Sequence, residues 1–272
     1  HPRSGDVESE LRMILKTTAF QLVAPDRACL RGSDTSHHHV DPSLRAFADQ
    51  GYALRWLRVS GQRYDLCCED SWSGFFIARQ LAIAADDEPL VIIHADDHMD
   101  MAPTLLAPAD AFLRDPIAGS PFDPANSADW EMSIVSGAVG IGNFITPLLF
   151  RSRPTHIRHL CDRMPPVGPV GVRLDSIRHR LVPDLAFASP CHTDEATWDR
   201  SSYARSTDAT ELCAGLPPGR LILHIDLDYF VNDFNGNVGG RARELDDDDR
   251  HSVLHRMDRL FDAVAAAKRP VA

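Results

Sequence analysis

The strongest constraint on the fold of this sequence is an apolar run that leads directly into a cluster of acidic and histidine residues. Leu90–Ile93 are four consecutive aliphatic residues, a pattern typical of a strand buried on both faces. The chain then continues as His94-Ala95-Asp96-Asp97-His98-Met99-Asp100. Because side chains alternate between the two faces of a strand, we expect Asp96, His98 and Asp100 to share one face.

A second segment has the same design. Leu221–Ile225 predicts another buried strand, and it leads to Asp226 and Asp228, which again share one face. Isolated carboxylates at the end of an apolar strand would be costly to desolvate or would take up protons. A cation between the two segments would remove that penalty. The alternative is a hydrogen-bonded acidic loop after each strand.

The ligand types indicate which cation the two segments would bind. Two divalent ions would balance the charge of four carboxylates, those of Asp96, Asp100, Asp226 and Asp228. Oxygen-rich ligation with one imidazole, that of His98, suits Mn²⁺ or Mg²⁺ better than zinc. His94 and His224 each precede a ligand Asp by two residues, and we interpret them as buried core histidines or as hydrogen-bond donors to the ligands.

Length and composition limit the protein class. A chain of 272 residues is long enough for one large α/β domain. The net charge of −11, with no basic stripe, argues against binding to nucleic acid. No apolar stretch approaches the roughly 18 residues needed to cross a bilayer. Six cysteines without a C-x-x-C pair favour reduced thiols, so we expect a cytoplasmic protein with no membrane partner, and a homo-oligomer is possible.

The segment before the first acidic cluster predicts a parallel sheet. A strand over Arg63–Cys68, a helix over Trp72–Ala84 and the Asp96 strand form a strand–helix–strand unit. Ligands of such sheets bind beyond the carboxyl ends of the strands, which is where Glu69, Asp96 and Asp226 fall.

The rest of the chain gives weaker signals. The Pro- and Ala-rich stretch over 101–128 has no clear period and predicts a long loop, either a lid over a site or a passive insertion. Val135–Phe150 predicts a Gly-rich turn that opens a helix, with Asn143 as its cap or as a substrate contact. Other predictions are a short helix within 7–24, a solvated loop at His37–His39, a helix after Asp41-Pro42, strands at Val170–Leu174 and Leu181–Val182, loop with a short helix over 190–216, and a helix over His251–Ala267 behind the charge run Asp246–Asp249.

The two strand ends resemble the ureohydrolase superfamily, whose members carry Asp-x-His-x-Asp and a later Asp-x-Asp around a di-manganese centre. Asp96, His98 and Asp100 match the first motif, and Asp226 and Asp228 match the second. The sequences His-x-Asp-x-His-x-Asp, Ile-Gly-Asn-Phe-Ile-x-Pro and Asp-Leu-Asp-Tyr-Phe resemble one branch, the peptide arginases and their uncharacterised relatives. The resemblance spans about Tyr64 to Phe234.

The resemblance implies a fold and an activity. The fold is α/β, a three-layer arginase-like domain over residues 1–272, with a central, mostly parallel sheet and helices on both faces. Residues 1–62 are not covered by it. The implied reaction is Mn²⁺-dependent hydrolysis, with two ions per chain, of arginine side chains in a peptide to ornithine and urea. The alternatives are hydrolysis of a small free guanidino compound such as arginine or agmatine, and a non-catalytic metal- or peptide-binding relative.

The resemblance also implies residue roles. Asp100, with His98, is the candidate to hold the attacking water and to pass its proton to the departing amine. Where the superfamily has a further ligand histidine this chain has none, so Glu69 or Asp70 is expected to replace it. The usual proton-shuttle histidine is also absent, and Asn143 lies nearest to its place. A final strand with a substrate-binding acid is expected to begin near residues 269–272.

Overall fold

A computed structural model describes residues 58–271 apart from 62–63, 68, 84–87, 110–111, 179–183, 196, 198 and 231–245. The predictions for 7–24, His37–His39, the helix after Pro42 and Leu181–Val182 lie outside the described residues. The chain forms two compact units: a sheet unit of Asp70–Asp226 with Arg269–Ala272, and a terminal unit of His1–Glu69 with Leu227–Lys268. The single domain over 1–272 stays a prediction. None of the helices in the described ranges combines the length and the apolar character of a membrane-spanning segment.

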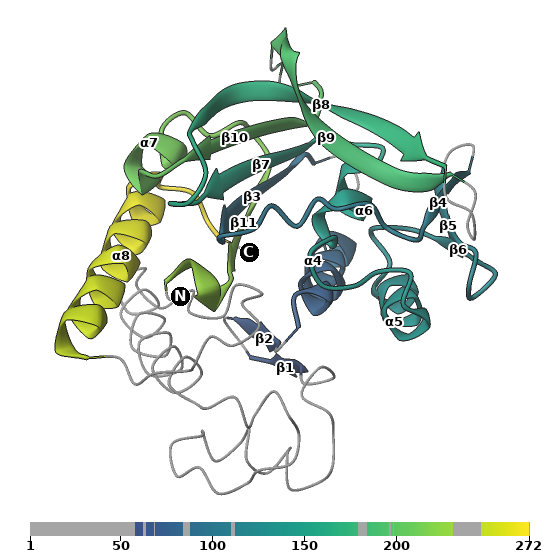
Figure 1. Cartoon of the computed structure of the whole chain (residues 1–272), viewed down its shortest axis with the longest axis horizontal. Coiled ribbons are helices and arrows are strands. Elements are labelled where there is room, and N and C mark those ends of the chain that lie inside the picture. Colours follow the sequence, from purple (N-terminus) through teal and green to yellow (C-terminus); the bar gives the residue numbers. More distant parts are fainter. Residues whose placement is uncertain are drawn as a thin grey trace, which may run out of the picture. The chain divides into compact units, whose positions relative to one another are not determined.

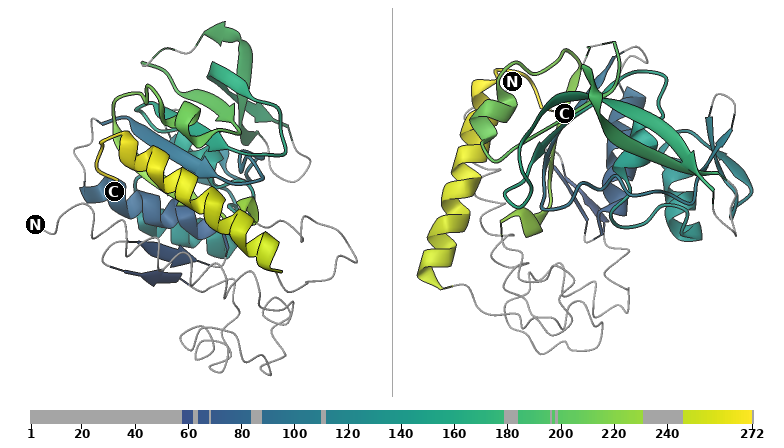
Figure 2. Two further views of the ribbon diagram at one scale, coloured as in Figure 1. Left: turned by 90° about the vertical axis from the view of Figure 1, so that its left-hand side faces the viewer. Right: turned by 45° about the horizontal axis from the view of Figure 1, so that its top comes forward.

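The sheet unit is built on a six-stranded sheet of mixed orientation, so the α/β class is confirmed (Figure 1). The strand order across the sheet is β11 (Arg220–Ile225), β3 (Leu90–Ala95), β7 (Thr155–Leu160), β10 (Ser202–Ser206), β8 (Val167–Ile177) and β9 (Leu185–Glu195). The first four strands are parallel, whereas β8 is antiparallel to both β10 and β9. Figure 2 shows the long β8–β9 hairpin continuing beyond the short parallel strands.

The two strands predicted from apolar runs lie side by side. Every residue of β3 is buried, and Leu221 and Ile222 of β11 are buried as well. Their register pairs Leu90 with Arg220 and Ala95 with Ile225, so both strands end at the same level of the sheet. The prediction that the two acidic clusters follow apolar strands at the carboxyl edge of a parallel sheet is therefore confirmed, and the structure adds that the two strands are neighbours.

Three further strands of the sheet, β7, β9 and β10, were not predicted. All residues of β7 and of β10 are buried, although both strands contain histidine, arginine or serine. The loop predicted over 190–216 is wrong in its first part, because β9 extends to Glu195 and β10 follows it. The short helix in that range is confirmed as α7 (Ala209–Cys213).

The stretch over 101–128 is not a long loop, which corrects that prediction. It contains a three-stranded antiparallel sheet and the start of a helix: β4 (Ala107–Ala109), β5 (Phe112–Asp115), β6 (Ser120–Phe122) and α5 (Ser127–Ser136). The buried Asp115 carboxylate accepts hydrogen bonds from the N–H groups of Ile117 and Ala118 and from the hydroxyls of Ser133 and Ser136. This one side chain therefore joins β5, the turn after it and α5.

Helix α4 (Ser71–Ile83) confirms the predicted helix and packs closely against α5. The contact is made where Gly74 faces the ring of Trp130, and a Cβ at Gly74 would lie only 2.1 Å from that ring. Trp130 is fully buried, and its indole N–H donates to the carbonyl of Pro124. The absence of a side chain at Gly74 sets the separation of these two helices.

In the terminal unit, the helix predicted near the C-terminus is confirmed as α8 (Asp247–Ala266). Asp246 is its N-cap, and the side chain of Asp249 completes a capping box with it. The rest of the charge run lies in the first turn, where acidic side chains favour the helix dipole. The unit also contains β1 (Arg58–Ser60), β2 (Asp65–Cys67) and the 3₁₀ turn η2 (Leu227–Tyr229).

Strand β2 confirms that a strand lies within 63–68, but it does not belong to the main sheet as predicted. It pairs antiparallel with β1 in a two-stranded sheet, so the expected strand–helix–strand unit within one parallel sheet is wrong. A strand inside a parallel sheet is covered on both faces and needs a continuous apolar run. Asp65-Leu66-Cys67 is short and only partly buried, which suits a two-stranded ribbon.

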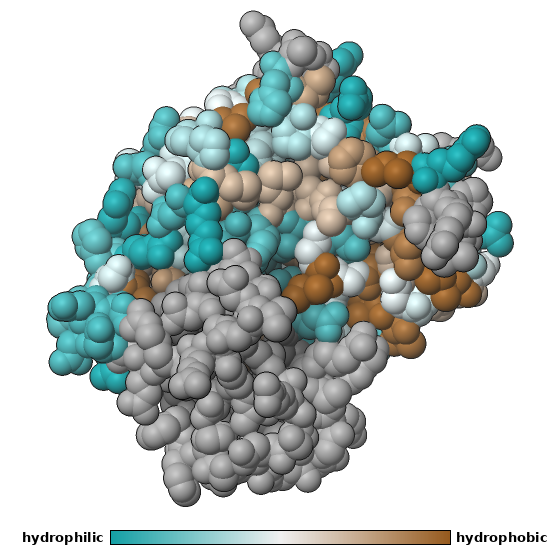
Figure 3. All heavy atoms as spheres, in the orientation of Figure 1, coloured by the Kyte–Doolittle hydropathy of each residue, from teal (hydrophilic) through white to brown (hydrophobic). Residues whose placement is uncertain are grey.

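The surface of the sheet unit carries several exposed apolar side chains. Ile117, Met132, Val135 and Ile141 are between 45% and 69% exposed. They belong to the turn after β5, to α5 and to the loop after it, and brown atoms gather over this part of the molecule in Figure 3. The described cysteines Cys67, Cys161, Cys191 and Cys213 are free thiols, as expected.

Candidate metal centre

The ends of β3 and β11 place Asp96 and Asp226 on adjacent strands. The backbone N–H of Asp226 donates to the carbonyl of Ala95 (2.9 Å), and that of Asp96 donates to the carbonyl of Leu160 at the end of β7 (3.1 Å). The parallel ladder therefore continues for one residue past each strand end. Both acids are delivered to the carboxyl edge of the sheet, where parallel sheets bind their ligands.

Asp70 joins these two acids from the turn that starts α4. The carbonyl of Asp70 accepts the N–H of Ser73 in the first turn of the helix. One carboxylate oxygen each of Asp70, Asp96 and Asp226 lies within 4.8 Å of the other two. We call these three residues the carboxylate triad. Glu69 and Asp70 are the two candidates to replace the missing histidine ligand. Of these, Asp70 lies in the sheet unit and belongs to the triad.

The charge of the carboxylate triad favours a cation. At separations of 4.8 Å or less, each pair of ionised carboxylates repels by at least about 3 kcal/mol for an effective dielectric constant of about 20. Asp96 is completely buried, so water contributes little to screening its charge. A divalent cation would replace this repulsion by attraction, and three oxygen ligands suit Mn²⁺ or Mg²⁺.

The segment from Asp96 to Asp100 is not a continuation of β3, and this corrects the expected strand alternation. The strand ends at Ala95, and a bend follows over 96–98. The backbone N–H of His98 donates to Oδ1 of Asp96 (2.5 Å), and Nδ1 of His98 lies 3.4 Å from the same oxygen. Within a strand, the N–H of His98 would donate to a carbonyl of a neighbouring strand. Here it donates to the side chain of Asp96 instead, and the chain turns back toward the sheet.

Asp100 returns to the site through an unusual backbone conformation. Its φ is +48°, in the left-handed region that few residues other than glycine, Asn and Asp adopt. Oδ2 of Asp100 lies 3.9 Å from Nε2 of His94, and Oδ2 of Asp96 lies 3.4 Å from the same nitrogen. Asp96 and Asp100 therefore face one side of the site, as predicted, although by a turn rather than by a strand.

The Gly-rich segment that carries the Ile-Gly-Asn-Phe-Ile-x-Pro sequence packs against Asp100. The N–H of Ile145 donates to the carbonyl of Asp100 (3.1 Å). A Cβ at Gly142, whose φ is +80°, would lie 3.8 Å from Oδ1 of Asp100. The ring of Phe144 lies against the imidazoles of His94 and His224. This segment closes one side of the site with backbone and an aromatic ring.

The expected role of Asn143 as a helix cap is wrong. The following helix, α6 (Ile145–Leu149), has Phe144 at its N-cap position without a side-chain hydrogen bond. The Asn143 amide instead accepts from the N–H of Gly140 (3.0 Å) and donates to the carbonyl of Pro103 (3.3 Å). Asn143 thus braces the Gly-rich segment, and its role in catalysis stays a prediction.

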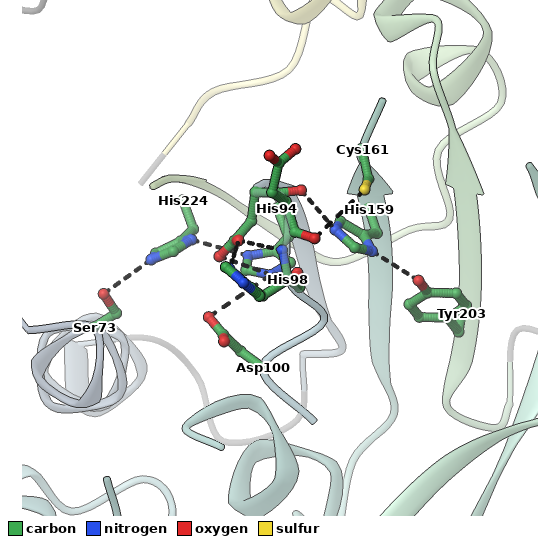
Figure 4. Close-up of polar contacts among 10 residues, drawn as sticks. Ser73, His94, His98, Asp100, His159, Cys161, Tyr203 and His224 are labelled. Carbon is green, nitrogen blue, oxygen red and sulfur yellow. Dashed lines mark hydrogen bonds and ion pairs between the residues drawn. The ribbon is translucent and has the colours of Figure 1, made fainter. Parts of the chain in front are cut away.

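His94 and His224 form a hydrogen-bonded relay behind the carboxylates (Figure 4). The contacts run from Ser73 Oγ to His224 Nε2 (3.0 Å), from His224 Nδ1 to His94 Nδ1 (2.9 Å), and from His94 Nε2 to the carbonyl of His98 (3.1 Å). A carbonyl only accepts, so His94 carries its proton on Nε2 and accepts at Nδ1. His224 must then donate from Nδ1 and accept the Ser73 hydroxyl at Nε2.

This relay decides between the two possible metal groups that lie wholly within the sheet unit. His94, Asp96 and His224 also present ligand atoms within 4.8 Å of one another. In the relay, however, the lone pair of each imidazole is engaged, so neither ring offers a nitrogen to a metal. Burial, with the neighbouring His224, lowers the pKa of His94 well below its ordinary value, and burial lowers that of His224 to about 4. The two neutral rings are satisfied buried histidines, which leaves the carboxylate triad as the better cation group.

Buried neutral histidines predict a loss of stability in mild acid. Burial lowers the pKa of His159 and of His224 to about 4, whereas the ordinary value is 6.5. Between pH 6.5 and 4 the unfolded chain therefore binds protons that the folded chain does not, so the free energy of unfolding falls as pH falls. We expect a loss of about 2 kcal/mol per histidine at pH 5.

This dependence can be measured by urea unfolding at pH 7.5, 6 and 5 with a chelator present, so that cation release does not contribute. His159→Gln removes one of the two titrating histidines, so the free energy of unfolding should depend less steeply on pH. An unfolding midpoint that stays constant from pH 7.5 to 5 would contradict the burial of His159 and His224 as neutral rings.

Two predicted ligands lie in the terminal unit. Glu69 is the last residue of its N-terminal part, and Asp228 lies in η2, two residues after Asp226. Their role as ligands stays a prediction. Sequence reasoning missed three residues: Ser73, which contacts the relay, His159, which contacts the backbone of Asp96, and Tyr203, which contacts His159. One signal was present: β3, β7 and β11 each contain Ile-x-His followed by an apolar residue.

No protein-family model matches the sequence, and a search of curated proteins finds no match. The functional proposal therefore depends on the motif residues and on their geometry.

Proposed function

We propose that the protein is a divalent-metal-dependent hydrolase that converts the guanidinium group of peptidyl arginine to urea and leaves ornithine in the peptide. The observation that carries the proposal is the carboxylate triad, with Asp70, Asp96 and Asp226 within 4.8 Å of one another at the carboxyl ends of parallel strands. Under this proposal the sheet belongs to a three-layer arginase-like fold. The cation is Mn²⁺, with two ions per chain as the resemblance implies.

The residues present fit a cation of this kind. Asp70, Asp96 and Asp226 would hold it, with Asp100, His98, Asp228 and Glu69 as the further ligands that the motifs suggest. When bound, the cation would supply Lewis acidity and lower the pKa of a water molecule. The carboxylates themselves attract the substrate, because a guanidinium group is cationic at every physiological pH.

Asp100 is the residue best placed to move the proton. The attacking water adds to the guanidinium carbon and loses one proton, and the departing amine of ornithine must gain one. Asp100 is buried beside Nε2 of His94, and its backbone is fixed by Ile145. A carboxylate held in this way accepts the proton of the water and returns it to the leaving nitrogen. The peptide thus gains the atoms of water and loses those of urea.

The preference for a peptide rests on the resemblance of the Ile141–Pro147 and Asp226–Phe230 sequences to the peptide arginase branch. The test incubates the protein with Mn²⁺ and an arginine-containing peptide, and follows peptide mass and released urea. Each converted arginine should lighten the peptide by the mass of urea less that of water. Free arginine and agmatine, in parallel reactions, test the alternative of a small guanidino substrate. Unchanged mass and no urea from any of these, with the cation bound, would contradict the proposal.

A further inference from the structure

The site is backed by a row of histidines on three neighbouring strands. His224, His94 and His159 are paired in register across β11, β3 and β7, and the ring centroid of His94 lies 5.0 Å from each of the other two. The relay through His224 and His94 ends on the carbonyl of His98. His159, at the other side of the row, belongs to a second chain of hydrogen bonds.

This second chain runs from Tyr203 to His159 (Figure 4) and ends on the backbone of Asp96. Nε2 of His159 lies 2.9 Å from the carbonyl oxygen of Asp96, and Nδ1 lies 2.7 Å from the hydroxyl of Tyr203. Nη1 of Arg205 lies 3.3 Å from the same hydroxyl. The three side chains come from β7 and β10, and none of them belongs to the motifs that suggested the metal centre.

The chemistry of the end groups fixes the direction of every bond in this chain. The carbonyl of Asp96 only accepts, so His159 carries its proton on Nε2 and accepts at Nδ1. The Tyr203 hydroxyl therefore donates to His159, and its oxygen accepts from Arg205, which only donates. Burial raises the pKa of Tyr203 to about 12, so the hydroxyl keeps its proton. A single tautomer of His159 satisfies all three contacts.

Arg205 anchors the far end of the chain. Its Nε donates to the carbonyl of Pro165 (2.8 Å), and its Nη1 also lies 3.2 Å from the sulfur of Met164 and 3.8 Å from that of Met99. Arg205 as a whole is only 9% exposed. Because Met99 lies within the acidic segment, Arg205 also contacts that segment directly.

We propose that His159, oriented by Tyr203 and Arg205, is a positioning residue that holds the backbone of Asp96 and thereby aims its carboxylate at Asp70 and Asp226. The N–H of Asp96 donates to the carbonyl of Leu160, and its carbonyl accepts from His159, so both backbone groups of Asp96 are held by β7. Asp96 begins a bend and has no strand beyond it to fix its orientation. This inference rests on the proposed cation site, and its predicted effect is on cation affinity.

Two substitutions at His159 separate positioning from packing. The amide nitrogen of glutamine can take the place of Nε2, so His159→Gln keeps a donor toward the carbonyl of Asp96, whereas His159→Leu removes it. Tyr203→Phe removes only the hydroxyl that selects the His159 tautomer. Tyr64→Phe removes a hydroxyl from a partly exposed tyrosine outside the sheet unit and is the matched control.

The measurements are Mn²⁺ affinity by titration calorimetry and thermal stability in the presence of a chelator. We expect His159→Leu and Tyr203→Phe to weaken Mn²⁺ binding by roughly 10- to 100-fold, with His159→Gln and Tyr64→Phe close to the wild type. The positioning role is overturned if His159→Leu binds Mn²⁺ as tightly as the wild type. It is also overturned if His159→Gln and His159→Leu weaken Mn²⁺ binding equally, and in proportion to the thermal stability that each variant loses.

The same experiment separates this inference from the proposed function. A wild type that binds Mn²⁺ but releases no urea would contradict the hydrolase, while the order of affinities would still decide the role of His159. A wild type that hydrolyses peptidyl arginine with His159 variants of unchanged affinity would leave the hydrolase standing and reject the positioning role. A wild type that binds no divalent cation would reject both.

Discussion

Asp96→Asn is expected to abolish tight binding of Mn²⁺ and to reduce urea release by at least about a thousandfold, which corresponds to about 4 kcal/mol. Asparagine keeps the side-chain oxygen that accepts the N–H of His98, so the bend after β3 should remain. The substitution removes only the charge of the most deeply buried member of the carboxylate triad. Titration calorimetry and a urea assay measure the two effects separately, and Asp226→Asn should behave in the same way.

The matched control is Asp97→Asn, in the same segment. The Asp97 carboxylate forms an ion pair with Arg163 (2.6 Å) and is not a member of the carboxylate triad. The Asp97→Asn variant should retain most of the cation affinity. Equal losses from Asp96→Asn and Asp97→Asn would show that the segment acts only through its overall charge. A parallel comparison of Asp70→Asn with Glu69→Gln tests which of these acids replaces the missing histidine ligand.

Gly74→Ala is expected to lower the free energy of unfolding by about 3 kcal/mol, the second large effect. The new methyl group would lie 2.1–2.4 Å from three ring atoms of Trp130, far inside contact distance. Alanine gains about 1 kcal/mol over glycine in a helix interior. The overlap outweighs this gain, because neither the helix backbone nor a fully buried indole ring can yield without disturbing the core. Urea unfolding gives the difference.

Gly168→Ala in β8 is the control, since a Cβ there would meet no atom within 4 Å. It should change stability by no more than about 0.5 kcal/mol. A double-mutant cycle with Trp130→Leu adds a second check, because a smaller side chain at 130 should relieve part of the overlap. If the two substitutions were simply additive, the close packing of Gly74 on Trp130 would not be the cause of the loss.

The parts of the fold that the sequence predicted correctly are those in which one physical signal dominates. Leu90–Ile93 and Leu221–Ile225 are nearly continuous apolar runs, so β3 and β11 could be recognised without knowledge of their partners. Helix α8 follows from apolar residues at helical spacing behind an acidic first turn. In each of these elements the residues specify the local structure with little help from tertiary contacts.

The missed elements depend on contacts between distant residues. β7 and β10 contain buried polar side chains, and such residues are tolerated only because they bind one another, as His156 binds Ser202 and His159 binds Tyr203. No local pattern predicts those pairs. For the same reason the acids of the site could be named from the sequence, whereas the bend at 96–98 could not, since it depends on a hydrogen bond from the chain to its own side chain.

The outer border of the six-stranded sheet has a consequence for how the protein behaves at high concentration. β9 ends the sheet, and a strand in that place can recruit another chain through its unused backbone groups. The N–H of Thr104 donates to the carbonyl of Ala186, and the N–H of Ala186 donates to the carbonyl of Leu106, so the backbone at the beginning of β9 is already bonded. Farther along the strand, Pro190 has no N–H to donate. The β8–β9 hairpin, the longest of the described chain, therefore has an edge whose free backbone groups are interrupted. This opposes self-association by addition of a strand from a second molecule.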